Sequence, residues 1–276
     1  MKTYATLLTT LMLLATCAFG QGDWRIADIS PLDYQTPGTK SFNVTIENVG
    51  STGIGSYKIS WQFDNGTTHT VSKVPFDTKF SGTKGLVQDP SFKVTLPAKG
   101  THQLKVWIHS TSPSDINASN DALTKTIHVF ETLPKKNVVL EVYKHQTCGP
   151  CYPAATYTEK NVKPNPDYAI VNIYTSNADA LQNSDGNIVN SAYGFAHPIP
   201  VFDRYQFPFS SSIGTRYSSG SQGMTLRGYG EREQFYEPVR VFMQSVDYNE
   251  SKRELKVKVG AQFYDNLMGD YRFNLY

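Results

Sequence analysis

The chain has 276 residues, with 26 lysines and arginines against 24 aspartates and glutamates, which gives a formal net charge of +2. It contains no basic run and no basic residues interleaved with aromatic ones, which excludes nucleic acid from the expected partners. The length allows two or three domains, and the 17 tyrosines and 15 phenylalanines, with only 18% charged residues, are typical of β-rich extracellular proteins.

The first 20 residues have the pattern of a secretory signal peptide. Lys2 supplies a positive charge, residues 5–19 are apolar, and Ala18 and Gly20 are small residues placed to direct cleavage before the next residue. The stretch is too short to be a transmembrane helix. An alternative is a lipoprotein signal in which Cys17 is lipidated. Either signal predicts export, to the periplasm, the outer membrane or the cell surface.

Residues 22–130 have the pattern of an all-β domain. Apolar and polar residues alternate in short runs at 41–47, 57–61 and 104–108, with turn-forming clusters between them. Short alternating strands at regular spacing predict an immunoglobulin-like β-sandwich. Trp61 and Trp107 are expected to lie in its core.

Within this domain, the stretches 46–50, 97–106 and 115–121 resemble the CARDB family of immunoglobulin-like bacterial surface modules. The resemblance implies a spacer or adhesion role, with a partner at the cell surface. An EF-hand loop starting at Asp115 is excluded, because Asn120 and Thr126 stand where that loop needs glycine and glutamate. A looser calcium site stays open, and a turn capped by side chains is favoured.

A polar, proline-bearing linker at residues 131–136 leads to the central segment, which we expect to span 137–235. A strand-like run at 137–143 precedes Cys148 and Cys151, and a helix-compatible run follows them. A strand, then a C-x-x-C pair, then a helix is the setting in which two cysteines indicate a redox centre. A disulfide-stabilised scaffold would instead spread its cysteines over the whole fold.

The chemistry of this pair follows from its position. Backbone N–H groups and the helix dipole favour the thiolate form of Cys148, which is therefore the expected attacking group. Gly149 allows a tight turn, and Pro150 fixes φ at the helix start. Cys151, one turn further on, is expected to resolve the mixed disulfide. No cofactor beyond the dithiol is needed, and no metal is assigned.

The four residues from Cys148 to Cys151 match the motif of thioredoxin, so the segment 137–235 resembles a thioredoxin-fold domain. The resemblance implies a second strand, for which residues 168–174 qualify, and a cis-proline that faces the cysteines. Pro200 fits best because strand residues follow it, and Pro198 is the competing candidate. The resemblance implies that Ile199 binds a substrate chain through its backbone while Pro200 shapes the groove.

The chain also departs from that family. Thr147 stands where the family usually has a tryptophan, and Val142 stands where it has a buried acid, with Glu141 one residue too early. Two alternatives to a redox centre stay open: an inert disulfide, and half of a zinc site formed by the two cysteines, with His145 as a third ligand. The sequence holds no second C-x-x-C pair, and His197 is the only other histidine of this domain.

The last segment, 236–276, returns to a β pattern. Runs at 239–246 and 254–259 flank a turn at 249–253 and predict a hairpin, and residues 271–276 predict a third strand. Three strands cannot close a sandwich, so this domain is expected to be truncated. The order of parts resembles a Bacteroidota outer-membrane family named for a 28-kilodalton member, which carries an export signal and a thioredoxin-like domain followed by β strands.

The sequence therefore predicts a multidomain protein with an N-terminal β-sandwich, a central α/β thioredoxin fold and C-terminal β strands. The expected function is thiol–disulfide exchange with exported proteins that bear thiols or disulfides. The alternative is a surface or outer-membrane binding or adhesion protein in which the Cys148–Cys151 disulfide is merely structural. The reduction potential of the pair separates the two.

Overall fold

The computed structural model describes residues 22–73, 84–175, 180–182, 184–193, 197–207, 213–215, 217–220, 223–226, 230 and 232–266. The expected signal peptide, with Cys17, and the expected strand at 271–276 lie outside these residues. Among the helices that the structure describes, none is long and apolar enough to cross a membrane. The chain divides into two compact units, and the second consists of 31–38, 96–101 and the residues from 127 onward.

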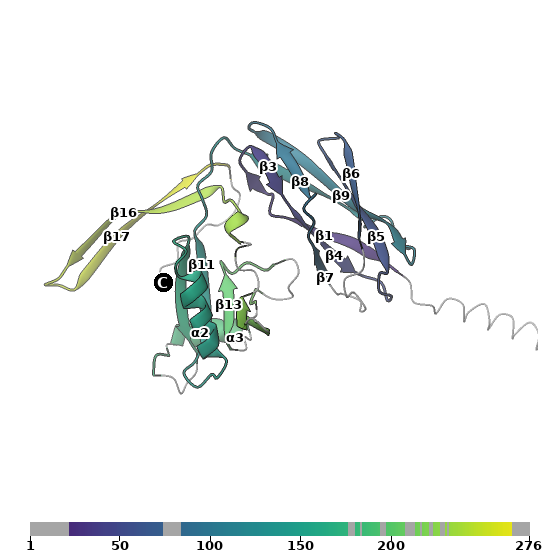
Figure 1. Ribbon diagram of the computed structural model, residues 1–276. Coiled ribbons are helices and arrows are strands. Elements are labelled where there is room, and N and C mark those ends of the chain that lie inside the picture. Colours follow the sequence, from purple (N-terminus) through teal and green to yellow (C-terminus); the bar gives the residue numbers. More distant parts are fainter. Residues whose placement is uncertain are drawn as a thin grey trace, which may run out of the picture. The chain divides into compact units, whose positions relative to one another are not determined.

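The N-terminal strands form the expected β-sandwich (Figure 1). A three-stranded sheet has the order β1-β4-β7, a five-stranded sheet has the order β2-β10-β9-β5-β6, and β3 pairs with β8. The strands are β1 (Trp24–Ser30), β2 (Tyr34–Gln35), β3 (Gly38–Ser41), β4 (Asn43–Asn48), β5 (Ser56–Phe63), β6 (Thr68–Lys73), β7 (Lys84–Val87), β8 (Lys93–Leu96), β9 (Gly100–Ser112) and β10 (Ala122–Val129).

Aromatic side chains fill the core of the sandwich. Trp61 is 3% exposed and meets Phe42 and Phe92 edge-on, with ring centroids 6.0 and 5.3 Å away. The expectation that Trp107 is also a core residue is wrong: its side chain is only partly buried, and the Lys105 ammonium lies 5.6 Å from its ring. The physical reason is strand alternation, because Leu104 and its alternate neighbours take the inward side of β9.

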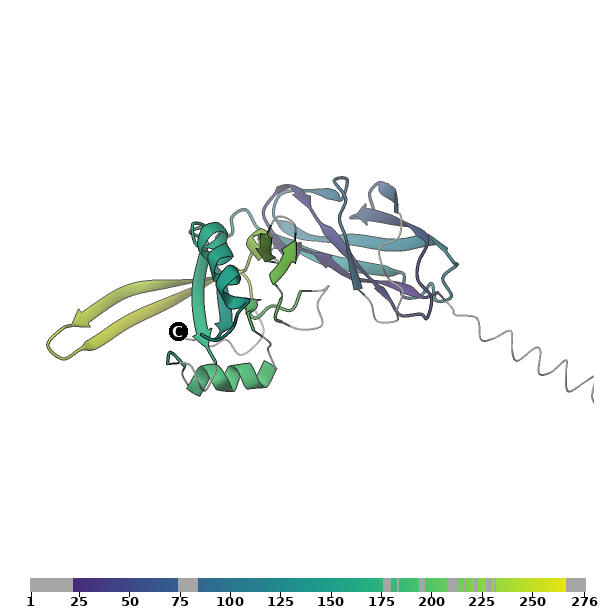
Figure 2. The same cartoon turned by 60° about the horizontal axis from the view of Figure 1, so that its bottom comes forward.

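The second unit contains a mixed sheet with the order β12-β11-β13. Strand β11 (Val138–Lys144) pairs in parallel with β12 (Tyr168–Tyr174) and antiparallel with β13 (Ile199–Phe202). The parallel pair requires a crossover, which α2 (Cys151–Tyr157) and the π-helical turn η2 (Thr158–Val162) provide. Figure 2 shows this helix along the sheet and α3 (Ser184–Tyr193) beyond it.

The apolar side of β11 packs on this crossover. Val138, Leu140 and Val142 form one buried cluster with Val162 and Phe202. The helical stretch ends at Val162 because the prolines that follow cannot extend it.

Smaller elements complete the unit: β14 (Tyr217–Gly220), β15 (Gly223–Leu226) and η3 (Arg232–Gln234). With α2 and α3 as the α-helices of the described residues, the molecule is mostly β.

The chain then forms a long antiparallel hairpin, β16 (Val239–Asn249) and β17 (Glu254–Phe263). Strand β16 is longer than the run at 239–246, β17 includes residues 261–263, which the sequence pattern allows as an extension, and the turn lies where it was expected. The register shifts between Met243 and Ser245, where one extra residue bulges out of β16. This two-stranded sheet pairs with no other strand among the described residues.

Candidate redox site

The two cysteines of the motif form a disulfide between β11 and α2. Their Sγ atoms are 2.01 Å apart and their Cα atoms 5.3 Å. The loop is held by backbone hydrogen bonds: the N–H of Cys148 donates to the carbonyl of His145 at 3.2 Å, and that of Cys151 donates to the carbonyl of Cys148 at 3.1 Å. The first helical residue is Cys151, so Cys148 precedes the helix.

The motif's two middle residues differ in how far they fit their expected roles. Pro150 occupies the N-cap position of α2 with φ −70°, as expected for a proline at a helix start. Gly149 does not have a positive φ, and a Cβ added there would meet nothing within 4 Å. The turn therefore does not require glycine, in contrast to the role expected from the sequence.

Solvent reaches the two cysteines unequally. Cys151 is 7% exposed, whereas Cys148 is partly exposed. Beside Cys151 lies a small cavity of about 30 Å³, whose lining includes Val142, Thr158 and Pro198. That volume suits about one water molecule. Cys148 is therefore the more accessible residue of the pair.

Pro198 lies beside Cys151, and the expectation that Pro200 is the cis-proline is wrong. The cis bond is His197–Pro198, and Ile199–Pro200 is not cis. Strand β13 begins at Ile199, so Pro200 lies within the strand, is buried, and pairs with Val142. Its carbonyl accepts a hydrogen bond from Thr215 N–H at 2.9 Å.

Ile199, the residue that was expected to bind substrate, also lies within β13, where it pairs with Tyr143. Strand β13 lies at the edge of the sheet β12-β11-β13, which is one of the few sheet positions that tolerate a proline such as Pro200. Pro198 lies just before the strand, and it lines the cavity next to Cys151. Pro198 is the competing candidate for the cis-proline that the sequence offered, and its peptide bond is cis.

A pair of histidines lies close to the motif, although they are far apart in the sequence. The ring centroids of His145 and His197 are 5.1 Å apart and the rings are nearly perpendicular. His197 Nε2 is 2.6 Å from the hydroxyl of Thr175, and His145 Nδ1 is 3.0 Å from that of Thr147. Burial lowers the pKa of His197, and the neighbouring His145 lowers it further. His197 is therefore mainly a neutral imidazole at neutral pH.

For the zinc alternative, this arrangement places two imidazoles near the motif. The two cysteine sulfurs, however, are bonded to each other in the disulfide and are not free thiolates. Within the described ranges, no group of three or more histidine, cysteine, aspartate and glutamate side chains is placed to hold a metal ion.

The sequence pattern does not reveal that the two histidines are in contact, because only the return of the chain through β13 brings His197 to the end of β11.

A buried acid is present on the other side of the sheet. Glu141 is 1% exposed, and the Arg204 guanidinium donates to its carboxylate from Nε at 3.1 Å and from Nη2 at 2.9 Å. Tyr143 donates from its hydroxyl at 3.2 Å. Since neighbouring strand residues point to opposite sides, Glu141 faces away from the cavity that Val142 lines. The one-residue offset noted in the sequence therefore removes this acid from the cysteines.

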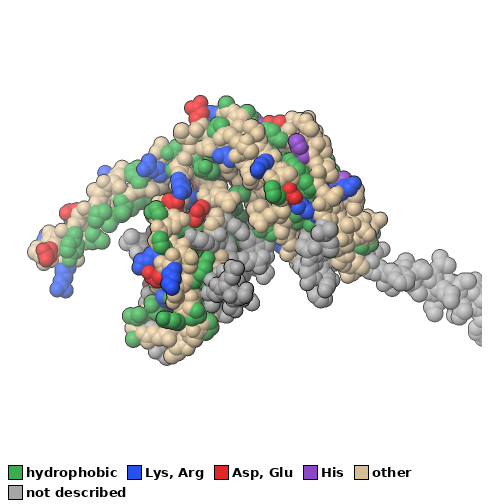
Figure 3. Space-filling model, viewed as in Figure 1, with side chains coloured by type: hydrophobic (Ala, Val, Ile, Leu, Met, Phe, Trp, Pro, Cys, Tyr) green, Lys and Arg blue, Asp and Glu red, His purple; other side chains and the backbone are tan. Residues whose placement is uncertain are grey.

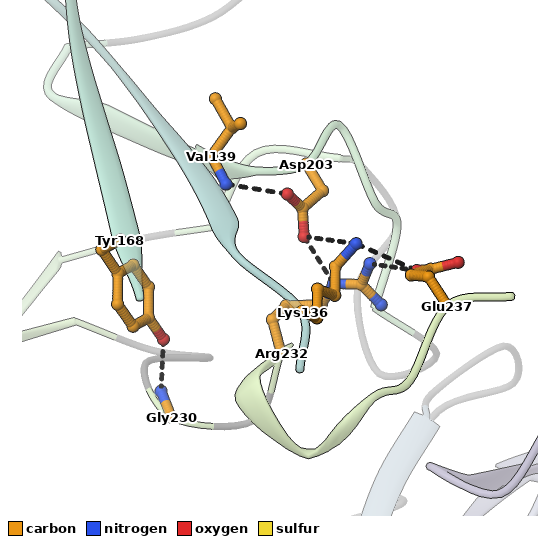
Figure 4. A network of polar contacts seen from close by, with 7 residues as sticks. All are labelled: Lys136, Val139, Tyr168, Asp203, Gly230, Arg232 and Glu237. Carbon is orange, nitrogen blue, oxygen red and sulfur yellow. Dashed lines mark hydrogen bonds and ion pairs between the residues drawn. The ribbon is translucent and has the colours of Figure 1, made fainter. Parts of the chain in front are cut away.

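A second charged cluster, shown in Figure 4, fixes the start of β11 to the chain beyond β13. Arg232, only 4% exposed, donates to Asp203 at 3.0 Å and to Glu237 at 3.3 Å, and Lys136 lies 3.0 Å from the same glutamate. The other Asp203 oxygen accepts the N–H of Val139 at 2.8 Å. These paired charges have structural partners, so we assign them no role in binding.

The turn expected at residues 115–121 of the sandwich is held by the carboxylate of Asp115. Asp115 accepts the N–H of Asn117 at 2.7 Å and that of Trp24 at 2.8 Å, which satisfies both of its oxygens. Burial raises the pKa of Asp121 to about 6, and the charges of Asp115 and Asp23 contribute to that rise. Asp115 thus acts as the hydrogen-bond acceptor of the turn, whereas Asp121 Oδ1 is buried without a hydrogen-bond partner.

Comparison with known proteins finds a similarity for only part of the chain. No family model matches it, and no curated protein matches it. The memberships suggested by the cysteine motif and by the order of parts, in the thioredoxin superfamily and in the Bacteroidota family, therefore gain no support from these comparisons.

Solved structures do match a stretch of the chain. A crystal structure of a CARDB domain from Pyrococcus furiosus, in complex with di-metal ions, is 18% identical, with a TM-score of 0.31, over 42% of this chain and 99% of that domain. A solution structure from Methanosarcina acetivorans, of a domain from a protein thought to lie at the cell surface, is 22% identical, with a TM-score of 0.32, over 41% of this chain and 95% of that domain. CARDB domains are thus among the structures that this chain resembles, as the sequence predicts.

Proposed function

We propose that this protein is an exported thiol–disulfide exchange protein in which Cys148 reacts with substrate and Cys151 resolves the intermediate. The observation that carries the proposal is the disulfide itself, which joins the partly exposed residue Cys148, in the loop after β11, to the buried residue Cys151 at the start of α2. Thiol–disulfide exchange uses such a difference, because Cys148 must reach the substrate whereas Cys151 attacks only within the protein.

In the proposed exchange, all electrons and protons pass between the protein and its substrate, so no further reactant is needed. In the reduced protein, the thiolate of Cys148 attacks a substrate disulfide, forms a mixed disulfide and releases one substrate thiolate. The thiol of Cys151 loses its proton and attacks the sulfur of Cys148, which releases the second substrate thiolate. The substrate gains two electrons and the protein regains its disulfide. The reverse sequence oxidises a substrate dithiol, and the potential decides which direction prevails.

The order of elements around the motif supports a thioredoxin-like fold for this part of the chain. A strand, a helix and a parallel strand are followed by a second helix and an antiparallel strand, with the cysteines at the first strand–helix junction. Pro198 takes the position beside the cysteines that the sequence pattern favoured for Pro200, because it lines the cavity with Cys151. The substrates are exported proteins with accessible thiols or disulfides.

The signal sequence and the N-terminal sandwich determine where the exchange would take place. The export pattern of residues 1–20 directs the chain to the periplasm, the outer membrane or the cell surface. The N-terminal sandwich serves as a spacer or adhesion module towards a cell-surface partner, in keeping with its likeness to CARDB domains.

One observation favours a second candidate, a surface binding protein with a structural disulfide. Glu141, the nearest fully buried acid on β11, faces away from the cysteines, so it offers no base to deprotonate Cys151. In this candidate function, the disulfide stabilises the loop that joins β11 to α2.

The reduction potential of the Cys148–Cys151 couple decides between them. The protein is equilibrated in glutathione or dithiothreitol buffers, and the free thiols are counted by mass after alkylation. A potential of roughly −270 to −120 mV supports exchange, and one below roughly −300 mV identifies a structural disulfide.

A trapping experiment gives an independent test. Cys151→Ser should accumulate a mixed disulfide with an oxidised protein substrate, because the resolving thiol is gone. Cys148→Ser is the matched control, in which the remaining thiol is buried and should trap little. Equal trapping by both variants would contradict the assigned roles.

A further inference from the structure

The hairpin of β16 and β17 has one side made entirely of apolar side chains. Residues directly opposite each other in antiparallel strands project to the same side, and the register pairs Met243 with Val259 and Tyr248 with Leu255. Val241 and Val246 share that side. These six side chains are between 39% and 71% exposed. Figure 3 shows hydrophobic side chains gathered along the hairpin.

The bulge in β16 keeps this side continuous. Before the bulge, alternation places Val241 and Met243 on the apolar side, and after it Val246 and Tyr248 take that side. Without the extra residue at Gln244, the second half of the strand would project its apolar residues to the opposite side. The irregularity and the sequence pattern therefore agree on a single apolar side.

The opposite side carries every charge of the two strands. Arg240 and Asp247 of β16 lie there, as do Glu254, Lys256 and Lys258 of β17. The apolar side thus has no charge to repel an identical surface. A two-stranded sheet with such a side exposed is marginally stable in water, so the physical expectation is that something covers it.

Shape and size favour a second copy of this chain over a single added strand. A strand that pairs with β16 or β17 extends the sheet at its edge and leaves the apolar side uncovered. A ribbon of this length is about 36 Å by about 10 Å, because strands rise about 3.3 Å per residue and lie about 4.8 Å apart. With side chains, two such sides would bury on the order of 1,000 Å² in total, the minimum for a specific interface.

We propose that this side of the hairpin is a homodimer interface, in which two ribbons pack face to face across a two-fold axis. Met243 and Val259 form the middle pair of the apolar side, so they lie nearest to the axis, and each copy covers the other along its whole length. The interface is isologous, because the same side chains face each other from both copies.

The test is the oligomeric state of the exported chain, measured by sedimentation velocity between about 1 and 100 µM. A dimer is expected for the natural sequence. Met243→Glu should weaken dimerisation by about 100-fold or more, because it brings two carboxylates together in an apolar interface. Ser245→Glu is the matched control on the opposite side of the same strand, and it should leave the dimer intact.

A second experiment guards against a variant that fails to fold. Met243→Glu mixed with Met243→Lys should form a mixed dimer, since opposite charges then meet near the axis. Circular dichroism of each variant alone checks that it is folded, and if Met243→Glu is not, Met243→Ser replaces it. A natural chain that stays monomeric at 100 µM overturns the proposal, whether its own residues or another protein cover the hairpin. A dimer that Met243→Glu leaves unchanged overturns it equally.

Discussion

Unequal access to the two sulfurs makes a direct prediction about reactivity. After reduction, a limiting amount of iodoacetamide should label Cys148 well ahead of Cys151, because the latter is only 7% exposed. Peptide mapping by mass spectrometry after a short reaction measures the ratio of the two labels. Unfolded protein is the control, in which both thiols should react alike. Preferential labelling of Cys151 in the folded protein would reverse the assigned roles.

At Asp121, the burial of a carboxyl group predicts a pH effect on stability. Burial and the charges of Asp115 and Asp23 raise its pKa to about 6, from 3.8 in an unfolded chain. The folded state therefore binds this proton more tightly, and its stability falls as the pH rises from about 4 to about 6. Asp121→Asn removes the penalty, so it should raise the melting temperature at pH 7.5.

The control for Asp121→Asn is the same comparison at pH 3.5, where the carboxyl is protonated in the folded state and mostly protonated in the unfolded state, so the substitution should change little. An equal change in melting temperature at both pH values would mean that the ionised carboxylate is not what destabilises the native sandwich.

Among whole elements, the turn that follows β13 is held by side chains. Asp203 and Arg204 both have positive φ, near 50°, which costs about 1 kcal/mol for a residue with a side chain. Each is compensated by a bond to β11: Asp203 accepts the N–H of Val139, and Arg204 pairs with the buried Glu141. The strand and the turn therefore stabilise each other.

The buried pair predicts a specific loss of stability. Arg204→Met leaves the carboxylate of Glu141 buried without its charged partner, and should lower the free energy of unfolding by about 2–3 kcal/mol, less than for a fully buried pair because Arg204 is partly exposed. Urea unfolding measures it. The double variant Glu141→Gln/Arg204→Met should recover part of the loss, and a double variant as unstable as the sum of the single ones would show that the two residues do not interact.

The elements themselves were largely predictable, because their signals are local. Alternation along the sequence locates the strands that flank the motif, and it also puts Glu141 on the side of β11 that faces away from the cysteines. Alternation alone does not decide which side of β9 faces inward, so Trp107 was misplaced. The prolines show the same limit, since the choice between Pro198 and Pro200 depends on where β13 begins to pair with β11.

At the scale of the whole molecule, contacts between distant segments did not follow from the sequence. The meeting of His145 with His197 depends on the crossover through α2 and the return through β13. The grouping of Lys136, Asp203, Arg232 and Glu237 likewise joins residues up to 101 positions apart. Such contacts join residues far apart in the sequence, so no periodic pattern marks them. The residue types involved are also common on protein surfaces and do not stand out.

The cluster around Asp203 has a mechanical consequence. Asp203 holds the N–H of Val139 near the start of β11, and through Arg232 it is connected to Glu237, two residues before the ribbon begins. A pull on the ribbon is therefore transmitted through short ionic links to the strand that ends at the cysteines. If the chain is held at both ends, we expect tension to break the ion pairs of Asp203, Arg232 and Glu237 before it disrupts the buried apolar cluster beneath the sheet.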